Sequence, residues 1–225
     1  MSGNEVCYER ERWDILKAKR EKAKFFMEKL TKQGIPSIVY GSIARGDVRE
    51  KSDVDIFIPQ LLPSFRIELA LDGVEIVERR IVQATPSYAI KGEIVIDEET
   101  TVSFPLVKMR DREMDFYRFG GCIGYEEVIR NKRVPGVDKR LMLIFPTEKG
   151  HVEVSIHEVH PSVVAKILGV SIDIVLERIR VLERRREVGR TGIYLCERLS
   201  SGDSFESALR EIALRDPAVR RRLGD

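Results

Sequence analysis

The chain of 225 residues carries 39 Lys and Arg residues against 37 Asp and Glu residues, and 43% of its residues are hydrophobic. This composition is typical of folded globular proteins and excludes a disordered chain, while a formal net charge of +2 does not by itself indicate nucleic-acid binding. No apolar run approaches the ~20 residues that a membrane-spanning helix requires, and the N-terminus is charged, so we expect a cytoplasmic protein with no membrane partner.

The cysteines exclude two further classes of protein. Cys7, Cys122 and Cys196 lie far apart and form no C-x-x-C motif, so the sequence predicts neither a disulfide framework nor a zinc site. Lys, Arg and Glu are abundant, which is typical of proteins from thermophiles.

The first predicted elements are a long helix and a buried strand. Apolar residues recur at helical spacing among Lys, Arg and Glu over residues 9–34, which predicts a surface helix. The apolar run 37–40 then predicts a buried strand. It ends at Gly41, which permits a tight turn, and Ser42 begins a short helix.

The next strand alternates acidic and apolar residues. Because side chains alternate between the faces of a strand, Asp53 and Asp55 project to one side while Val54, Ile56 and Ile58 point into the core. Two carboxylates whose Cα atoms are about 7 Å apart repel each other, and a divalent cation relieves this repulsion. The hard oxygen ligands favour Mg²⁺. A solvated acidic edge strand is the alternative, and the preceding Gly-Ser turn favours the metal site.

These residues carry a family resemblance. The spacing over residues 41–58 resembles the signature of the nucleotidyltransferase superfamily typified by DNA polymerase β, most closely its minimal and archaeal CCA-adding-like branches. The residues that carry the resemblance are Gly41, Ser42, Arg45, Gly46, Asp47, Ser52, Asp53 and Asp55. The resemblance implies an α+β fold with a mixed sheet flanked by helices.

The resemblance also implies roles for the residues of the signature. Asp53 and Asp55 would hold two Mg²⁺ ions that act on a nucleoside triphosphate. Gly41 and Ser42 would bind its phosphates at a helix N-terminus, and Arg45 would reach the triphosphate from one turn further on. The alternatives are that Ser42 only caps the helix and that Arg45 is a solvated helix residue.

The resemblance implies a third carboxylate from a neighbouring strand, which acts as a metal ligand and in catalysis. We expect Asp115 in this role, because it lies in an apolar–acid–apolar run over residues 113–119 that resembles the family's third-acid strand. Asp97 is the rival, but residues 97–100 have the composition of a polar hairpin turn.

The remaining patterns up to residue 156 predict a helix, further strands and a glycine-rich loop at 119–125. The predicted helix spans 63–70, and the predicted strands span 74–82, 88–96, 101–107, 141–145 and 151–156. We therefore expect a nucleotidyltransferase domain over residues 1–156.

A helical domain is expected over residues 157–225. A helix over 162–168, a turn at 169–171 and a helix over 172–187 resemble a helix-turn-helix, and a last helix is expected over 205–214. The expected stop of the second helix is 189–192. Phosphate contacts to RNA or DNA are expected from the arginines of the second helix, Arg178, Arg180, Arg184, Arg185 and Arg186. The alternative is that this segment only packs against the protein, since Glu177, Glu183 and Glu187 offset part of the charge.

The sequence thus predicts a Mg²⁺-dependent nucleotidyltransferase that moves a nucleoside monophosphate from a nucleoside triphosphate, expected to be ATP, onto an acceptor hydroxyl and releases pyrophosphate. The acceptor stays open between an RNA end, a partner protein and a small molecule. The alternative is a non-catalytic, nucleotide-sensing regulator that binds DNA. Because the glycine, the serine and both acids of the signature are present, the sequence favours catalysis.

Overall fold

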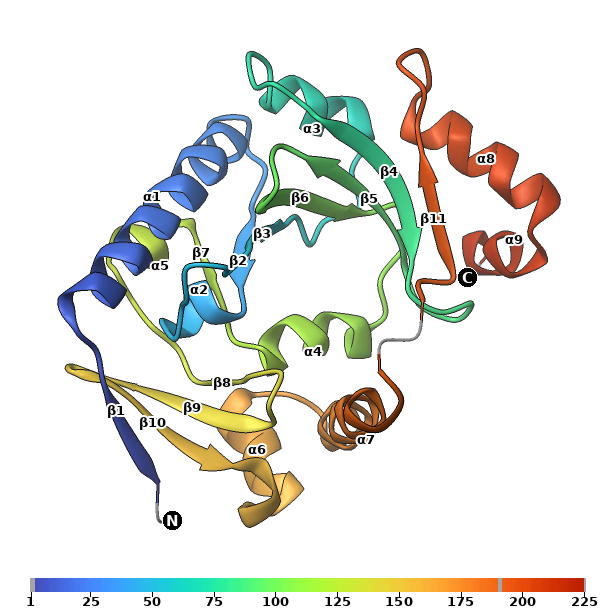
Figure 1. Cartoon of the computed structure of the whole chain (residues 1–225). Helices are drawn as coiled ribbons and strands as arrows, with labels where there is room; N and C mark the ends of the chain where they lie inside the picture. The colour runs from blue at the N-terminus through green and yellow to red at the C-terminus, as the bar shows by residue number, and fades with distance from the viewer. Residues whose placement is uncertain (1–2, 190–191, 225) are drawn as a thin grey trace.

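The computed structural model describes residues 3–189 and 192–224, so two residues of the stop expected at 189–192, Arg190 and Thr191, lie outside the described residues. The described strands form two sheets, one of seven strands and one of four (Figure 1). No described helix combines the length and the apolar character needed to cross a membrane.

The large sheet has the strand order β11-β4-β5-β6-β3-β2-β7. Its strands are β2 (Ile38–Tyr40), β3 (Val54–Phe57), β4 (Glu78–Gln83), β5 (Ile90–Val95), β6 (Thr100–Pro105), β7 (Cys122–Gly124) and β11 (Leu195–Arg198). Neighbours pair antiparallel except β3 and β6, which are parallel. The sheet is therefore mixed, as expected.

The small sheet has the order β1-β10-β9-β8 and is antiparallel throughout. Its strands are β1 (Asn4–Cys7), β8 (Gly136–Val137), β9 (Met142–Thr147) and β10 (Gly150–Ser155). The first strand of the chain thus pairs with a strand almost 150 residues later, which joins the N-terminus to the small sheet.

Helices cover one face of the large sheet and bury the main core. They are α1 (Arg10–Lys32), α3 (Ser64–Ala70), α5 (Tyr125–Ile129), α8 (Phe205–Arg215) and α9 (Pro217–Leu223). Val54 and Ile56 of β3 are fully buried in this core together with Leu30 of α1 and Phe205 of α8. The alternation along β3 therefore directs the acidic side chains to the opposite face.

The helix α4 (Asp111–Phe119) packs on that opposite face (Figure 1). The ring of Tyr117 stacks on Phe57 of β3 with a centroid distance of 3.9 Å. The strand expected over 113–119 is therefore wrong. The Glu113 carboxylate accepts the backbone N–H of Arg110 and caps the first turn, and a short apolar–acid–apolar run does not by itself distinguish a strand from a helix.

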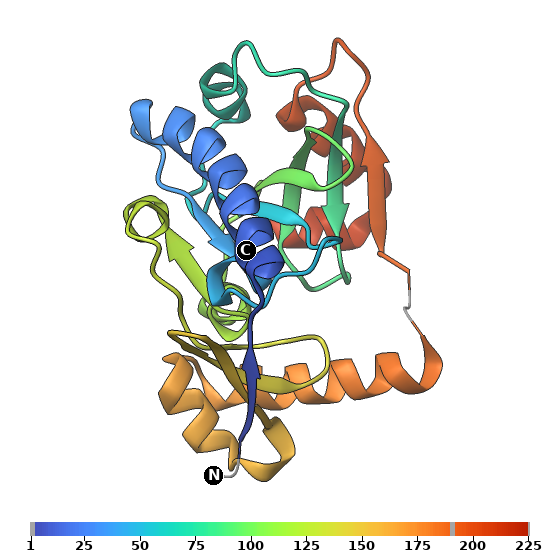
Figure 2. The same ribbon diagram turned by 60° about the vertical axis from the view of Figure 1, so that its left-hand side comes forward.

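A second core lies between the small sheet and two helices, α6 (Pro161–Leu168) and α7 (Ile172–Val188). Leu143, Val164 and Ile174 are fully buried in it. Gly169 ends α6 with a φ of 63°, a left-handed conformation that suits glycine. The two helices and their turn lie where the sequence predicts them, and their use in nucleic-acid binding stays a prediction. Figure 2 shows α7 as a long helix below the large sheet.

The C-terminal part of the chain is not a helical domain of its own. Strand β11 pairs with β4, and Phe205 of α8 packs edge-to-face on Phe104 of β6 at a centroid distance of 4.9 Å. Residues after 156 thus contribute to both cores, which corrects the expected separation of a helical unit. The sequence of β11, Leu-Cys-Glu-Arg, is too short and polar to predict a strand by its pattern.

Candidate active site

Asp53 and Asp55 lie at the start of β3, on the face that the α1 and α8 layer leaves open. Asp53 directly precedes the strand and is exposed, while Asp55 lies within it and is half-buried. Val54 and Ile56 beside them are fully buried in the main core. The regular strand therefore presents the two carboxylates together, as the side-chain alternation predicts.

The environment of Asp55 disfavours its charge. Burial above all, and then the negative charges of Asp53 and Glu93, raise the pKa of Asp55 to about 6. The positive charges of Lys139 and Lys91 oppose this shift of the pKa. A carboxylate whose ionised form is disfavoured beside a second carboxylate is a donor set that fits a divalent cation with a preference for oxygen ligands.

Glu93 is the acid near Asp55 that the sequence analysis missed. Ser103 of β6 pairs with Phe57 on one side and with Glu93 of β5 on the other, so these side chains lie in one row on the face of Asp55. The row continues to Arg80 of β4, whose Nε lies 2.7 Å from a Glu93 oxygen. The alternation of polar and apolar residues along β5 could have indicated Glu93.

Two lysines approach the acids from different parts of the chain. Lys91 is half-buried on β5, burial of its ammonium lowers its pKa, and no hydrogen bond or ion pair joins it to another described residue. Lys139 is exposed in the turn between β8 and β9. Neither lysine could be predicted as a site residue. The Lys91–Gly92 pair has the composition of a turn or bulge, and the local pattern around Lys139 does not indicate a site.

Asp115 does not join the acids of β3. It is buried in α4, where one carboxylate oxygen accepts the backbone N–H of Ser171 at 2.9 Å and the other accepts Arg118 Nη1 at 3.3 Å. Asp115 thus holds the start of α7. Its rival, Asp97, pairs with Lys22 at 2.8 Å. Within the described ranges, no three His, Cys, Asp or Glu side chains form a ready-made metal centre.

The turn before α2 (Ser42–Arg45) depends on Gly41, whose φ is 75°. Gly41 rather than Ser42 takes the N-cap position, and its carbonyl accepts the backbone N–H of Arg45 at 3.0 Å. Ser42 is half-buried, and no hydrogen bond of its hydroxyl to another described residue is formed. The serine hydroxyl is therefore free to accept or donate toward a ligand.

Arg45 is a structural residue in this geometry. Its guanidinium is buried and makes two hydrogen bonds of 3.0 Å to the two carboxylate oxygens of Asp47. It also donates to the carbonyl oxygen of Gly120 at 2.5 Å and to that of Val137 at 3.4 Å. The expected contact of Arg45 with a triphosphate would require this network to break, and the phosphate role of Arg45 stays a prediction.

The arginines of α7 divide into two groups. The guanidinium of Arg178 lies over the ring of Phe116 at 5.0 Å from its centroid, so Arg178 packs against α4. Arg180, Arg184, Arg185 and Arg186 are exposed. The structure thus places four of these five basic side chains at the surface.

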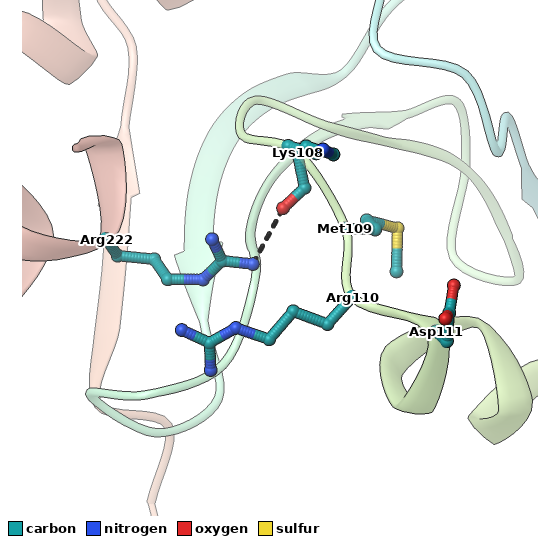
Figure 3. A pocket seen from close by; sticks show the side chains of 5 residues that line it. All are labelled: Lys108, Met109, Arg110, Asp111 and Arg222. Atoms are coloured by element: carbon teal, nitrogen blue, oxygen red, sulfur yellow. Dashed lines mark hydrogen bonds between the residues drawn. The ribbon is translucent and has the colours of Figure 1, made fainter. Parts of the chain in front are cut away.

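A pocket of about 390 Å³ lies away from the acids, at the N-terminal end of α4 (Figure 3). Lys108, Met109, Arg110, Asp111 and Arg222 line it. The buried guanidinium of Arg222 donates to the carbonyl oxygen of Lys108 at 2.8 Å and to the carboxylate of Glu113 at 3.0 Å. Arg222 therefore connects α9 to the start of α4, and its guanidinium has a structural role.

Residues 19–111 match the protein family described as nucleotidyltransferase domain. The matched segment runs from α1 to the start of α4 and contains Gly41, Ser42, Asp53, Asp55 and Glu93. It ends before Asp115, before the strands β8, β9 and β10 of the small sheet and before α7. No curated protein and no solved structure matches the chain. The family match supports transfer of a nucleoside monophosphate as the general activity.

Proposed function

We propose that the chain is a Mg²⁺-dependent nucleotidyltransferase that transfers a nucleoside monophosphate from a nucleoside triphosphate, with ATP as the expected donor, to an acceptor hydroxyl. The observation that carries the proposal is the pair Asp53 and Asp55, presented by one strand beside the Gly41–Ser42 turn within the family-matched segment. Pyrophosphate is the leaving group.

The acids fit a magnesium site. Because burial and Asp53 both raise the pKa of Asp55, a divalent cation would remove an unfavourable interaction. Bound Mg²⁺ would neutralise phosphate charge and lower the pKa of the acceptor hydroxyl. With two protein carboxylates, the other ligands would be phosphate oxygens and water, which is how Mg²⁺ is usually bound.

Glu93 takes the role of the third acid in place of Asp115. Arg80 holds one oxygen of Glu93 at 2.7 Å, so the carboxylate has a fixed position in the row of side chains next to Asp55. In the transfer, the acceptor oxygen forms a bond to the α-phosphorus, the bond from that phosphorus to pyrophosphate breaks, and the acceptor proton passes to Glu93.

Ser42, Lys91 and Lys139 bind the anionic substrate in place of Arg45. Ser42 offers its hydroxyl and its backbone N–H at the turn, and both lysines lie close enough to Asp55 to lower its pKa. The half-buried Lys91 ammonium makes no hydrogen bond or ion pair within the described chain, and only the nearby charges of Glu93 and Asp55 oppose its own charge, so it can also bind an anionic ligand.

The test is transfer of label from each nucleoside triphosphate labelled at the α-phosphate, with Mg²⁺, total RNA and total cell protein, together with pyrophosphate release. We expect Asp55→Asn to lower the rate at least about a hundredfold, because the loss of a metal ligand removes several kcal/mol of transition-state stabilisation. Asp53→Asn and Glu93→Gln should also lose most of the rate.

Asp115→Asn is the matched control, because it removes a buried carboxylate that lies outside the matched segment. Its rate should stay within a few-fold of that of the unchanged protein at temperatures where both are folded. Equal turnover by Asp55→Asn would refute the proposal. Nucleotide binding without turnover by the unchanged protein would point to the regulator instead.

A further inference from the structure

Helix α7 presents arginines that no acid neutralises. Arg180, Arg184 and Arg185 are exposed, and none of them pairs with a carboxylate of the described chain. Two acids of the helix are engaged elsewhere: Glu177 pairs with Arg112, and Glu183 lies 3.7 Å from His157. The C-terminal half of α7 thus keeps an excess of positive charge, although Glu187 is also exposed there.

A contact connects these arginines to the small sheet. Arg186 donates to the carbonyl oxygen of Arg140, which brings the C-terminal half of α7 against the turn between β8 and β9. Lys139 is exposed in the same turn. Positive charge therefore continues from this turn to the surface of α7.

A chain of side-chain contacts through α4 connects α7 to β3. Arg178 packs on Phe116, and the adjacent Tyr117 stacks on Phe57, two residues beyond Asp55. Arg178 also lies near Arg185. Burial lowers the pKa of Arg178, and the positive charge of Arg185 lowers it further. Figure 1 shows α7 beside α4, in agreement with these contacts.

We infer that the acceptor is a polynucleotide whose phosphodiester backbone lies along α7 and whose terminal hydroxyl reaches the acids of β3. This inference rests on the proposed function. Arg180 and Arg185 are five residues apart, or about 7.5 Å along the helix, so the row can contact successive phosphates of one strand. Arginine binds phosphate through charge-assisted hydrogen bonds and releases counterions from the strand.

A partner protein fits this surface less well. Protein interfaces have cores depleted in charge, whereas the exposed surface from Arg184 to Glu187 is charged at every position. A small acceptor would occupy only the neighbourhood of Asp55 and would leave the arginines of α7 without a ligand. The continuous, unpaired charge is what favours a long anionic chain.

The test compares two triple variants with the same change in net charge. One is Arg180→Ala/Arg184→Ala/Arg185→Ala, and the matched control replaces three exposed arginines of the helix-covered side, Arg10, Arg66 and Arg210, by Ala. Binding of fluorescently labelled single-stranded RNA and DNA is measured by anisotropy against salt. Transfer of label from ATP to each strand is measured in parallel.

We expect the α7 variant to bind strands at least about tenfold more weakly and to reduce the slope of log affinity against log salt by about 2, since each lost contact to a single strand contributes about 0.7. The control should bind like the unchanged protein. The KM for the strand should rise in the α7 variant, while the KM for ATP stays the same. The RNA and DNA measurements show which strand is the acceptor.

Unchanged strand binding by the α7 variant, or transfer of label to the protein fraction and not to a strand, would overturn the inference. Failure of the proposed function looks different. In that case no fraction gains label and no pyrophosphate is released by the unchanged protein, whatever the strand-binding measurements show.

Discussion

At the scale of single residues, the role of a charged side chain depends on its partners, and the local sequence shows only some of them. Asp53 and Asp55 can be predicted, because strand alternation alone sets their common face. Arg45 cannot, because its partners Gly120 and Val137 come from distant segments. Glu93 was missed for the same reason: it is a neighbour of Asp55 only through the pairing of β5 with β6 and of β6 with β3.

The raised pKa of Asp55 predicts a pH-dependent stability. The folded protein holds a proton on Asp55 up to about pH 6, whereas the unfolded chain releases it near the ordinary pKa of 3.8. The unfolding free energy therefore falls as pH rises from about 4 to 6 and stays lowered above that. Asp55→Asn, which stays neutral, should gain about 3 kcal/mol at pH 7 and little at pH 4.

Urea unfolding at both pH values measures this effect. Asp14→Asn, which neutralises an exposed carboxylate of α1, should show no comparable gain at pH 7. Added Mg²⁺ should stabilise the unchanged protein more than Asp55→Asn. A loss of stability at pH 7 on replacing Asp55 by Asn would contradict the assigned environment of this side chain.

The buried pair of Arg45 and Asp47 predicts that Arg45 serves the fold. Arg45→Met leaves the buried Asp47 carboxylate without its partner and should cost about 3–5 kcal/mol of unfolding free energy. The double variant Arg45→Met/Asp47→Asn should recover part of this loss, because both charges are then gone. If Arg45→Met had the same urea midpoint as the unchanged protein but a higher KM for ATP, Arg45 would instead contact the triphosphate.

At the scale of elements, predictability follows the strength of the periodic pattern. The long α1 and α7 and the apolar strands β5, β6, β9 and β10 lie within a few residues of the expected ranges. The strands β1, β7 and β11 are short and carry polar residues or glycine, so only pairing with a neighbour makes them strands. The helix α4 was mistaken for a strand because its run is short.

The docking of α8 on the large sheet depends on the lack of a side chain at Gly92. A Cβ there would lie 2.5 Å from Phe104 and 2.9 Å from Phe205. Gly92→Ala should therefore cost about 1–3 kcal/mol by overpacking. Phe205→Ala should cost about 3–5 kcal/mol, because this fully buried ring leaves a cavity.

A double-mutant cycle in urea separates the two effects. Gly92→Ala/Phe205→Ala should cost less than the sum of the single changes, since the space left by Phe205 relieves part of the overlap. Leu214→Ala on the same helix is the control and should change little, because Leu214 is 79% exposed. Strict additivity of the two core changes would show that α8 does not pack on Gly92.

At the scale of the whole molecule, the two cores are built from segments far apart in the chain. The main core combines α1 and β3 with β11 and α8, and the second core combines the small sheet with α6 and α7. The sequence pattern changes near residue 156, because the predicted strands end there and predicted helices follow. It does not show that the later segments return to the earlier sheet, since long-range pairing leaves no mark in local sequence.

This architecture predicts that residues 1–156 do not fold alone. The truncation removes buried side chains such as Phe205, Leu209 and Ile212 from the main core and Val164 and Ile174 from the second. At about 1.5–3 kcal/mol for each, the loss of these side chains alone is about as large as the 5–15 kcal/mol by which a domain is usually stable. Thermal unfolding followed by circular dichroism should show no cooperative transition for 1–156, whereas co-expression with 157–225 should restore one.

A fragment 1–156 that melts cooperatively near the temperature of the full chain would contradict this prediction. It would show that residues 1–156 form a stable core without the side chains of the later helices.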